Sequence, residues 1–255
     1  MGIENKAAYL SIVIPTKNEE MRLPETLRHI QNTLFAYQHS LEIIVSDDKS
    51  TDDTDQVCAP FQQNLNILFL RNVGSRGVGS ALRAGIERAS GKYILIYDAD
   101  GAVPLPEVEK LIPWLEAGND IAAGSRCLRE SDIRVPQPWY RRLIGLLWRF
   151  IVSMIAPTGV KDTQCGFKLY SRETAKRVFS KTAAESFSVR VEALWLAKNS
   201  GARIKEVPIE WTDRPGTRIK IWRHSVTMLV DLIRLRWRHP AMLYKVQTRK
   251  ISGAP

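Results

Sequence analysis

The feature that most constrains the fold is the alternation of short apolar segments with segments of helical character. The apolar segments are rich in β-branched residues, as buried strands are, and we predict strands at 10–15, 41–46, 67–71, 92–97 and 120–124. We predict helices between them at 22–37, 51–61, 77–89 and 106–115. Because the strands are apolar throughout and helices separate them, the pattern predicts an α/β fold with a mostly parallel sheet covered on both faces.

Several of these predicted strands end in polar or charged residues. The first strand runs into Pro15-Thr16-Lys17-Asn18-Glu19 and the second ends at Asp47-Asp48. The fourth ends at Asp98-Ala99-Asp100 and the fifth at Gly124-Ser125-Arg126. Open α/β sheets bind ligands beyond the carboxyl ends of their strands. The sequence therefore predicts one cleft in which four acids and an arginine converge.

Asp98 and Asp100 suit a divalent metal that completes its shell with substrate phosphates and water. Acids at a strand end can also face solvent or cap the next helix, so this pair alone is a weak signal. In 47–54 (DDKSTDDT) we expect Asp48 to face the cleft, and Asp52 and Asp53 to serve the following helix. The glycine-rich segment 72–79 could approach a phosphate, but its glycine spacing excludes the common ATP and NAD signatures.

Positive charge is concentrated near the C-terminus. The chain of 255 residues carries a net charge of +10, and residues 214–255 contain ten Lys and Arg against one acid, Asp231. Such asymmetry predicts anionic partners: nucleic acid, lipid headgroups or phosphorylated substrates. The three cysteines fit neither a disulfide framework nor a zinc site, and the N-terminus does not read as a signal peptide. We therefore expect a protein that faces the cytosol.

Two amphipathic segments mix Trp, Leu and Ile with Arg, at 137–156 and 225–237. Neither is a long enough uncharged apolar run to span a bilayer. Both an interfacial position in a membrane and a buried position against the sheet fit the first segment, and Trp139, Trp148 and Trp222 could be core residues or lipid contacts. The basic tail favours the interface for the second segment.

Six separated blocks resemble, in order, the family 2 glycosyltransferases of the GT-A fold. They are PTKNEE (15–20), DDKSTDDT (47–54), NVGSRGVGSALRAGIERASGKYILIYDADGA (72–102), GSR (124–126), DTQCGFKLYSRE (162–173) and EVPIEW (206–211). The last two narrow the resemblance to dolichyl-phosphate glucosyltransferases, with polyprenyl-phosphate mannosyltransferases as close relatives. The resemblance covers roughly residues 10–238. It implies a GT-A catalytic domain over 1–212, with an interfacial helix region at about 137–157, and an acceptor loop, amphipathic helix and basic membrane-associating tail over 213–255.

The resemblance implies donor-side roles for residues at the strand ends. Pro15, Glu19 and Asp48 would hold the nucleotide base and ribose. The segment Asp98-Ala99-Asp100 would hold the donor diphosphate together with Mg²⁺ or Mn²⁺, and Asp98 and Asp100 would be the metal ligands. Asp100 would hold the diphosphate and metal most directly, and it is the acid that we predict to be catalytic.

Acceptor-side roles fall on basic residues. Arg126 would face the acceptor phosphate, and Arg141 or Arg142 resembles a helix arginine that mannosyl relatives use for the same group. Arg214 and Lys220 match the arginine and lysine of a loop that closes over donor diphosphate and acceptor in those relatives.

Two positions and one loop depart from the pattern of these families. Lys17 stands where an aromatic residue is usual, and Ala102 stands where mannosyl relatives have a glutamine metal ligand, which implies a water in its place. The loop 214–220 (RPGTRIK) has its glycine one position early and no serine before the lysine.

The activity implied is inverting transfer of glucose from UDP-glucose to dolichyl or another polyprenyl phosphate, at the cytosolic face of a membrane. A phosphate acceptor is already anionic and needs no general base, in contrast to a sugar hydroxyl. GDP-mannose or a UDP-N-acetylhexosamine remains open as donor. A nucleotidyltransferase, a nucleic-acid-binding protein and a non-catalytic membrane adaptor are weaker alternatives. We expect no nucleic-acid partner, because the basic residues accompany apolar helices.

Overall fold

The computed structural model describes residues 8–34, 40–72, 74, 77–135, 138–214 and 221–238. Lys220 lies outside these residues. The side chains of Arg141, Arg142 and Trp222 are likewise outside the described part of the chain, although their backbone belongs to helices.

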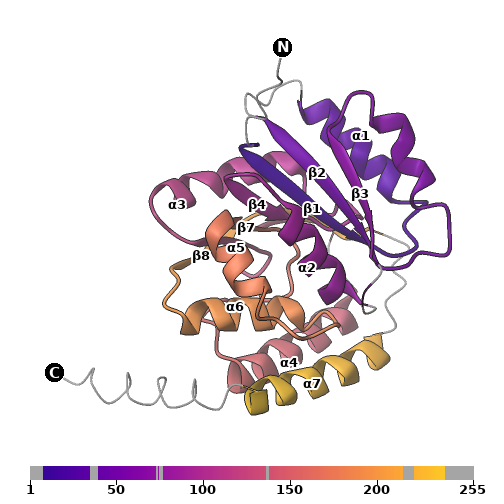
Figure 1. Ribbon diagram of the computed structural model, residues 1–255. Helices are drawn as coiled ribbons and strands as arrows, with labels where there is room; N and C mark the ends of the chain where they lie inside the picture. The colour runs from indigo at the N-terminus through magenta and orange to yellow at the C-terminus, as the bar shows by residue number, and fades with distance from the viewer. Residues whose placement is uncertain are drawn as a thin grey trace.

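A seven-stranded sheet forms the centre of the molecule, with the order β3-β2-β1-β4-β7-β5-β8 (Figure 1). All neighbouring strands are parallel except β7, which is antiparallel to both β4 and β5. The prediction of a mostly parallel sheet is confirmed, and the five predicted strands are β1 to β5. The strands are β1 Leu10–Thr16, β2 Leu41–Asp47, β3 Ile67–Arg71, β4 Tyr93–Ile96, β5 Ile121–Ser125, β7 Lys168–Ser171 and β8 Ile204–Pro208, and a separate parallel pair consists of β6 Asp132–Val135 and β9 Glu210–Thr212.

The two faces of the sheet carry separate apolar cores. Along β1, Leu10, Ile12 and Ile14 pack into one core and Val13 into the other, as the two-residue period of a strand requires. The first core includes α1 (Leu23–Leu34) and α3 (Ile112–Glu116), and the second includes α2 (Val78–Arg88), α5 (Arg172–Phe179) and α6 (Val189–Asn199).

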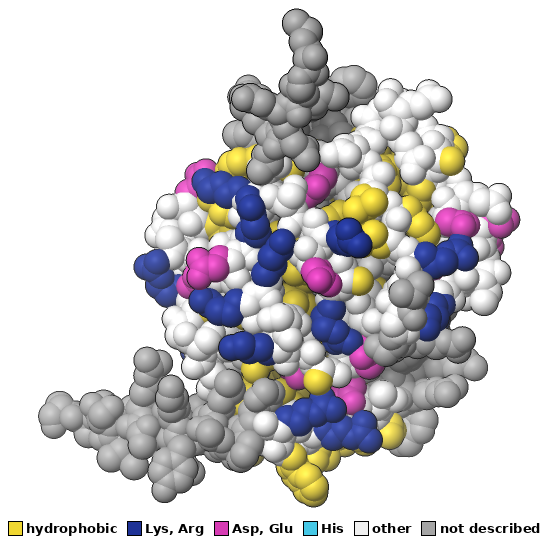
Figure 2. Space-filling model, in the orientation of Figure 1, with side chains coloured by type: hydrophobic (Ala, Val, Ile, Leu, Met, Phe, Trp, Pro, Cys, Tyr) yellow, Lys and Arg dark blue, Asp and Glu magenta, His cyan; other side chains and the backbone are white. Residues whose placement is uncertain are grey.

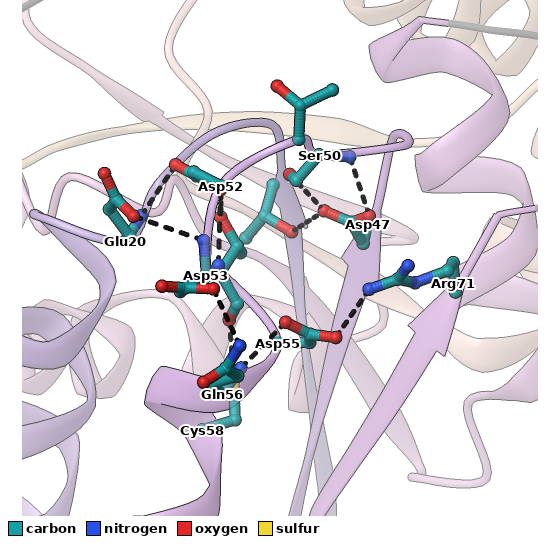
Figure 3. Close-up of polar contacts among 12 residues, drawn as sticks. Glu20, Asp47, Ser50, Asp52, Asp53, Asp55, Gln56, Cys58 and Arg71 are labelled. Atoms are coloured by element: carbon teal, nitrogen blue, oxygen red, sulfur yellow. Dashed lines mark hydrogen bonds and ion pairs between the residues drawn. The ribbon is translucent and has the colours of Figure 1, made fainter.

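Two of the predicted helices are wrong in form. The segment 51–61 contains only a 3₁₀ helix, η1 (Gln56–Phe61), and 106–115 splits into the 3₁₀ helix η2 (Leu105–Lys110) and the short α3. In the first segment, Asp52 accepts hydrogen bonds from the backbone N–H groups of Glu20 (3.3 Å) and Thr54 (3.2 Å), so a side chain replaces the helical partner (Figure 3). In the second segment, Pro113 lacks an N–H donor and interrupts the helical ladder.

Helices α4 (Trp139–Ile155) and α7 (Ile221–Arg238) lie side by side at one end of the molecule (Figure 1). Their contact includes a hydrogen bond of 3.4 Å from Arg236 Nη2 to the carbonyl oxygen of Met154. In the described part of the chain, no helix is long and apolar enough to cross a membrane.

The outer side of this helix pair is apolar. Trp139, Leu147 and Phe150 of α4 are 76%, 60% and 63% exposed, and Trp237 of α7 is 83% exposed. Figure 2 shows hydrophobic side chains at the lower end of the molecule, next to Lys and Arg side chains. The alternative that Trp139 is a core residue is therefore wrong: α4 buries the opposite side of the helix, where Val152 packs into the second core.

Candidate active site

A cleft of about 870 Å³ lies at the carboxyl ends of the parallel strands. It brings together residues that are far apart in the sequence, as the position of ligand sites in open parallel sheets predicts. The cleft is lined by eight of the predicted site residues: Pro15, Glu19, Asp48, Asp98, Ala99, Asp100, Arg126 and Arg214.

The backbone turn after β4 fixes the two acids of the Asp98-Ala99-Asp100 segment. Gly101 adopts a left-handed conformation (φ +59°), and a Cβ atom there would lie 2.9 Å from Thr26 Oγ1. The same hydroxyl group donates a hydrogen bond of 2.8 Å to the carbonyl oxygen of Ala99. Helix α1 therefore holds this turn in place.

Asp98 is paired with a buried cation. Its Oδ1 atom accepts a hydrogen bond from Nη2 of Arg190, a residue of α6 that is 8% exposed. Arg190 Nη1 also donates to the carbonyl oxygen of Gln164 (2.7 Å). Gly166 closes the other side of the carboxylate, because a Cβ atom at this position would lie 2.0 Å from Asp98 Oδ2.

Asp100 has a different environment. One carboxylate oxygen accepts the backbone N–H of Ala102 at 3.1 Å, and the described residues supply no ion-pair partner for this side chain. Burial, followed by the charge of Asp98, raises the pKa of Asp100 above its ordinary value. A negative charge held in such a place favours binding of a cation.

The cleft is also lined by Asp48, which is 3% exposed. Its Oδ1 atom accepts the backbone N–H of Gly77 (2.7 Å), and its Oδ2 atom pairs with Lys17 Nζ (2.8 Å). The side chain of Lys17 is 53% exposed, so Lys17 is the movable partner. Glu19 is also paired, with Arg22 at 2.5 Å.

The other acids of the 47–54 segment are structural (Figure 3). Asp47 is fully buried and accepts hydrogen bonds from the backbone N–H (3.0 Å) and the hydroxyl group of Ser50. Asp52 fixes the turn described above, and Asp53 accepts a hydrogen bond of 2.7 Å from Gln56 Nε2 of η1. Asp48 is the member of this segment that lines the cleft.

Arg126 is held rigidly on the far wall. Its Nε and Nη2 atoms donate to the two carboxylate oxygens of Asp162, at 2.7 and 2.9 Å, and its guanidinium group lies 5.4 Å from the ring centre of Trp211. Burial alone would raise the pKa of Asp162, but the charge and hydrogen bonds of Arg126 hold it well below its ordinary value. Arg214 also lines the cleft and pairs with Glu25 of α1 at 3.3 Å.

Two buried cations, one lining the cleft and one behind it, were not predicted from the sequence. Arg190 pairs with Asp98 from 92 positions away. Lys168 of β7 is 1% exposed and donates hydrogen bonds to the carbonyl oxygens of Thr163 (3.2 Å) and Cys165. A lone cation within the apolar segment 189–197 (VRVEALWLA) is the signal in the sequence that could have identified Arg190.

Comparison with known proteins agrees with this geometry. The family model described as Glycosyl transferase family 2 matches residues 11–179. The dolichyl-phosphate beta-glucosyltransferase of Dictyostelium discoideum is 34% identical over 96% of this chain and 80% of the relative, and that of Homo sapiens is 35% identical over 95% and 80%. A crystal structure of glucosyl-3-phosphoglycerate synthase from Mycobacterium tuberculosis, in complex with Mn²⁺, UDP and glucosyl-3-phosphoglycerate, superposes with a TM-score of 0.66. It is 21% identical and covers 89% of this chain and 78% of its own.

The fold and the strand-end cleft thus define a glycosyltransferase of the GT-A type, as predicted. The chain belongs to glycosyl transferase family 2 and, within it, to the family of the dolichyl-phosphate beta-glucosyltransferases.

Proposed function

We propose that the protein transfers glucose from UDP-glucose to dolichyl phosphate or a related polyprenyl phosphate, with inversion at the anomeric carbon. Relatives that carry the name dolichyl-phosphate beta-glucosyltransferase align with 95–96% of the chain. One observation carries the proposal: the cleft has an acidic wall and, opposite in character, a largely apolar wall. Strand-end carboxylates form one wall, and α4 and α7 contribute Ile144, Trp148 and Met228 to the other.

A divalent cation, Mg²⁺ or Mn²⁺, fits the acidic wall. The described residues contain no cluster of three or more His, Cys, Asp or Glu side chains that could hold a metal by itself. Asp100, without a cation partner among them, and the remaining oxygen of Asp98 would hold the ion, and donor diphosphate and water would complete its shell. When bound, it would neutralise charge on the leaving diphosphate. The Mn²⁺ in the Mycobacterium tuberculosis structure supports the proposal of a divalent cation.

The reaction asks the protein to bring two anions together, the acceptor phosphate and the donor diphosphate. Arg126, fixed by Asp162, supplies a cation of defined orientation on the acceptor wall, and Arg214 supplies a second. We assign Pro15, Glu19 and Asp48 to nucleotide binding. Lys17, whose side chain is 53% exposed, would exchange its ion pair with Asp48 for a contact with the bound nucleotide. The acceptor oxygen is already charged, so no catalytic base is needed.

The exposed apolar side of α4 and α7 supports attachment to a membrane surface that holds the acceptor. Leu143, Leu147 and Phe150 are 59–63% exposed on α4, and Arg234 of α7 has a side chain 64% exposed. Apolar side chains bordered by arginines are typical of helices that lie in a membrane interface, and each basic residue adds roughly 1 kcal/mol near an anionic surface. We propose peripheral attachment to the cytoplasmic face, with 213–255 contributing.

The proposal is tested by transfer of radiolabelled glucose from UDP-glucose into polyprenyl phosphate that can be extracted with organic solvent. The reaction is run with Mg²⁺, with Mn²⁺ and with EDTA, and in parallel with GDP-mannose and UDP-N-acetylglucosamine. Asp100→Ala is compared with Glu173→Ala, which removes an acid 87% exposed on α5.

Metal-dependent label from UDP-glucose, lost in Asp100→Ala and kept in Glu173→Ala, is the expected result. Label from GDP-mannose or UDP-N-acetylglucosamine alone would keep the fold and the acceptor but refute glucose as the sugar. No lipid label from any donor, with folded protein, would refute the lipid acceptor.

A further inference from the structure

Helix α7 carries one acid within the residues described for it, and that acid points inward. The side chain of Asp231 is 14% exposed, whereas Val230 and Trp237 of the same helix are 40% and 83% exposed. Asp231 Oδ2 accepts hydrogen bonds from the hydroxyl groups of Ser186 (2.6 Å) and Ser188 (2.8 Å). Charge-assisted hydrogen bonds of this length are among the stronger ones in proteins.

The two serines belong to a segment, 184–188, that forms part of the cleft wall through Glu185, Ser186 and Phe187. Its other side is anchored to the body of the protein. Arg83 of α2 donates to the carbonyl oxygen of Ala184 (3.1 Å) and pairs with Glu185 (2.5 Å), and Glu192 accepts the backbone N–H of Ala184 (2.8 Å). The wall segment thus lies between the fixed α2–α6 framework and α7.

The same wall segment contacts the partners of both donor-side acids. The guanidinium group of Arg190, which pairs with Asp98, lies 5.2 Å from the ring centre of Phe187. Gly77, whose N–H binds Asp48, is packed against Glu185 so closely that a Cβ atom would lie 2.2 Å from its carbonyl oxygen. On this side the segment is also held by Arg83 of α2 and by Glu192 of α6, neither of which belongs to α7.

Asp231 instead controls what α7 presents to the cleft. Thr227 and Met228 line the cleft, and they precede Asp231 by four and three positions. Residues three and four apart share one face of a helix. A bond that fixes Asp231 against the wall segment therefore fixes the rotation of α7 about its axis, with Met228, which is 9% exposed, turned inward and Val230 and Trp237 turned outward.

We infer that Asp231 is a positioning residue. Its bonds to Ser186 and Ser188 fix the rotation of α7, so that one side of the helix faces the acceptor side of the cleft while the exposed apolar side chains face the proposed membrane surface. The identity of the acceptor rests on the proposed function. The locking contact itself rests on the hydrogen bonds and burial described above.

The test compares Asp231→Ala, Asp231→Asn and Ser186→Ala/Ser188→Ala with the wild type, and uses Glu173→Ala as a matched control acid. Steady-state kinetics give KM for polyprenyl phosphate in vesicles and KM for UDP-glucose. Hydrogen exchange followed by mass spectrometry gives the protection of amides in 184–188 and 226–231, which requires no activity.

We expect Asp231→Ala to raise the acceptor KM about tenfold, with the donor KM within twofold, and to speed exchange in both segments. Asp231→Asn, whose amide oxygen still accepts hydrogen bonds, restores most of both. The serine double variant matches Asp231→Ala, and combining the changes adds little, because one contact is removed twice.

Equal increases in donor and acceptor KM, or unchanged exchange in Asp231→Ala, would overturn the inference. Wild-type protein without lipid product would refute the proposed function instead, and the exchange data would then decide the locking contact alone.

Discussion

Gly166 offers a direct test of how tightly the first acid of the site is held. A Cβ atom at this position would lie 2.0 Å from Oδ2 and 2.3 Å from Cγ of Asp98, whereas ordinary contacts begin at 3.4 Å. In Gly166→Ala the carboxylate must therefore move by at least about 1.4 Å, or the 162–166 loop must move away from it. The carboxylate cannot move so far and keep its bond to Arg190, which is buried and also bound to Gln164.

The expected loss follows from that displacement. A misplacement of about 1 Å in an active site can lower the rate by about 100-fold, or about 2.7 kcal/mol in the barrier. We expect at least this loss in kcat/KM. Gly166 is not in the left-handed region, so alanine adds no backbone strain and we expect the variant to fold.

The assay is steady-state transfer from UDP-glucose to polyprenyl phosphate, with calorimetric binding of UDP in the presence of Mn²⁺ as a second readout and thermal unfolding as a control. Asp98→Ala provides the decisive comparison, because Gly166→Ala should change binding by less than about threefold in that background if it acts only through Asp98. Wild-type activity in Gly166→Ala, or an equal loss of UDP binding in both backgrounds, would refute the steric argument.

Three further predictions concern residues that do not line the cleft themselves. Burial lowers the pKa of Lys168 to about 8. Between about pH 8 and 10.5 the unfolded chain therefore binds more protons than the folded chain, and the free energy of unfolding rises with pH by on the order of 3 kcal/mol. Urea denaturation over this pH range should show the rise in the wild type and not in Lys168→Met. Asp162→Asn leaves Arg126 without its carboxylate partner, and should cost on the order of 3 kcal/mol in urea denaturation and lower kcat/KM for the acceptor at least tenfold. Leu147→Glu, on the outer side of α4, should reduce sedimentation with anionic vesicles while transfer to a short-chain acceptor in detergent stays within about twofold; unchanged sedimentation would exclude α4 from the membrane contact.

The part of the fold that could be predicted is the part built from local patterns. Strands β1 to β5 are short apolar runs, and their polar ends meet at one edge because parallel strands place them there. Strand β7 was not predicted, since Lys168-Leu169-Tyr170-Ser171 is half polar and carries a buried lysine. Its burial depends on carbonyl groups of the 162–166 loop, which no periodicity in the sequence reveals.

The acids of the site could be predicted from the sequence, but most of the cations that pair with them could not. Asp98 and Asp100 follow a strand and can be located from the sequence alone. Arg190 approaches Asp98 from α6, 92 positions away, and such a pair is set by tertiary packing. Lys17 differs from Arg190, because it directly follows β1 and its partner Asp48 directly follows β2. Their pairing could be expected once β1 and β2 are known to be neighbouring parallel strands.

These pairings bear on how an acidic cleft can accept two anions. Unpaired carboxylates would repel both the diphosphate and the acceptor phosphate. In this cleft Asp48 is paired with Lys17, Glu19 with Arg22 and Asp98 with Arg190. Asp100 differs from them, because the described residues provide it with a backbone N–H and no cation. The two acids of one short motif thus differ: Asp98 is paired with a cation of the protein and would offer the proposed metal one remaining oxygen, whereas Asp100 has no cation partner among the described residues and would offer its carboxylate.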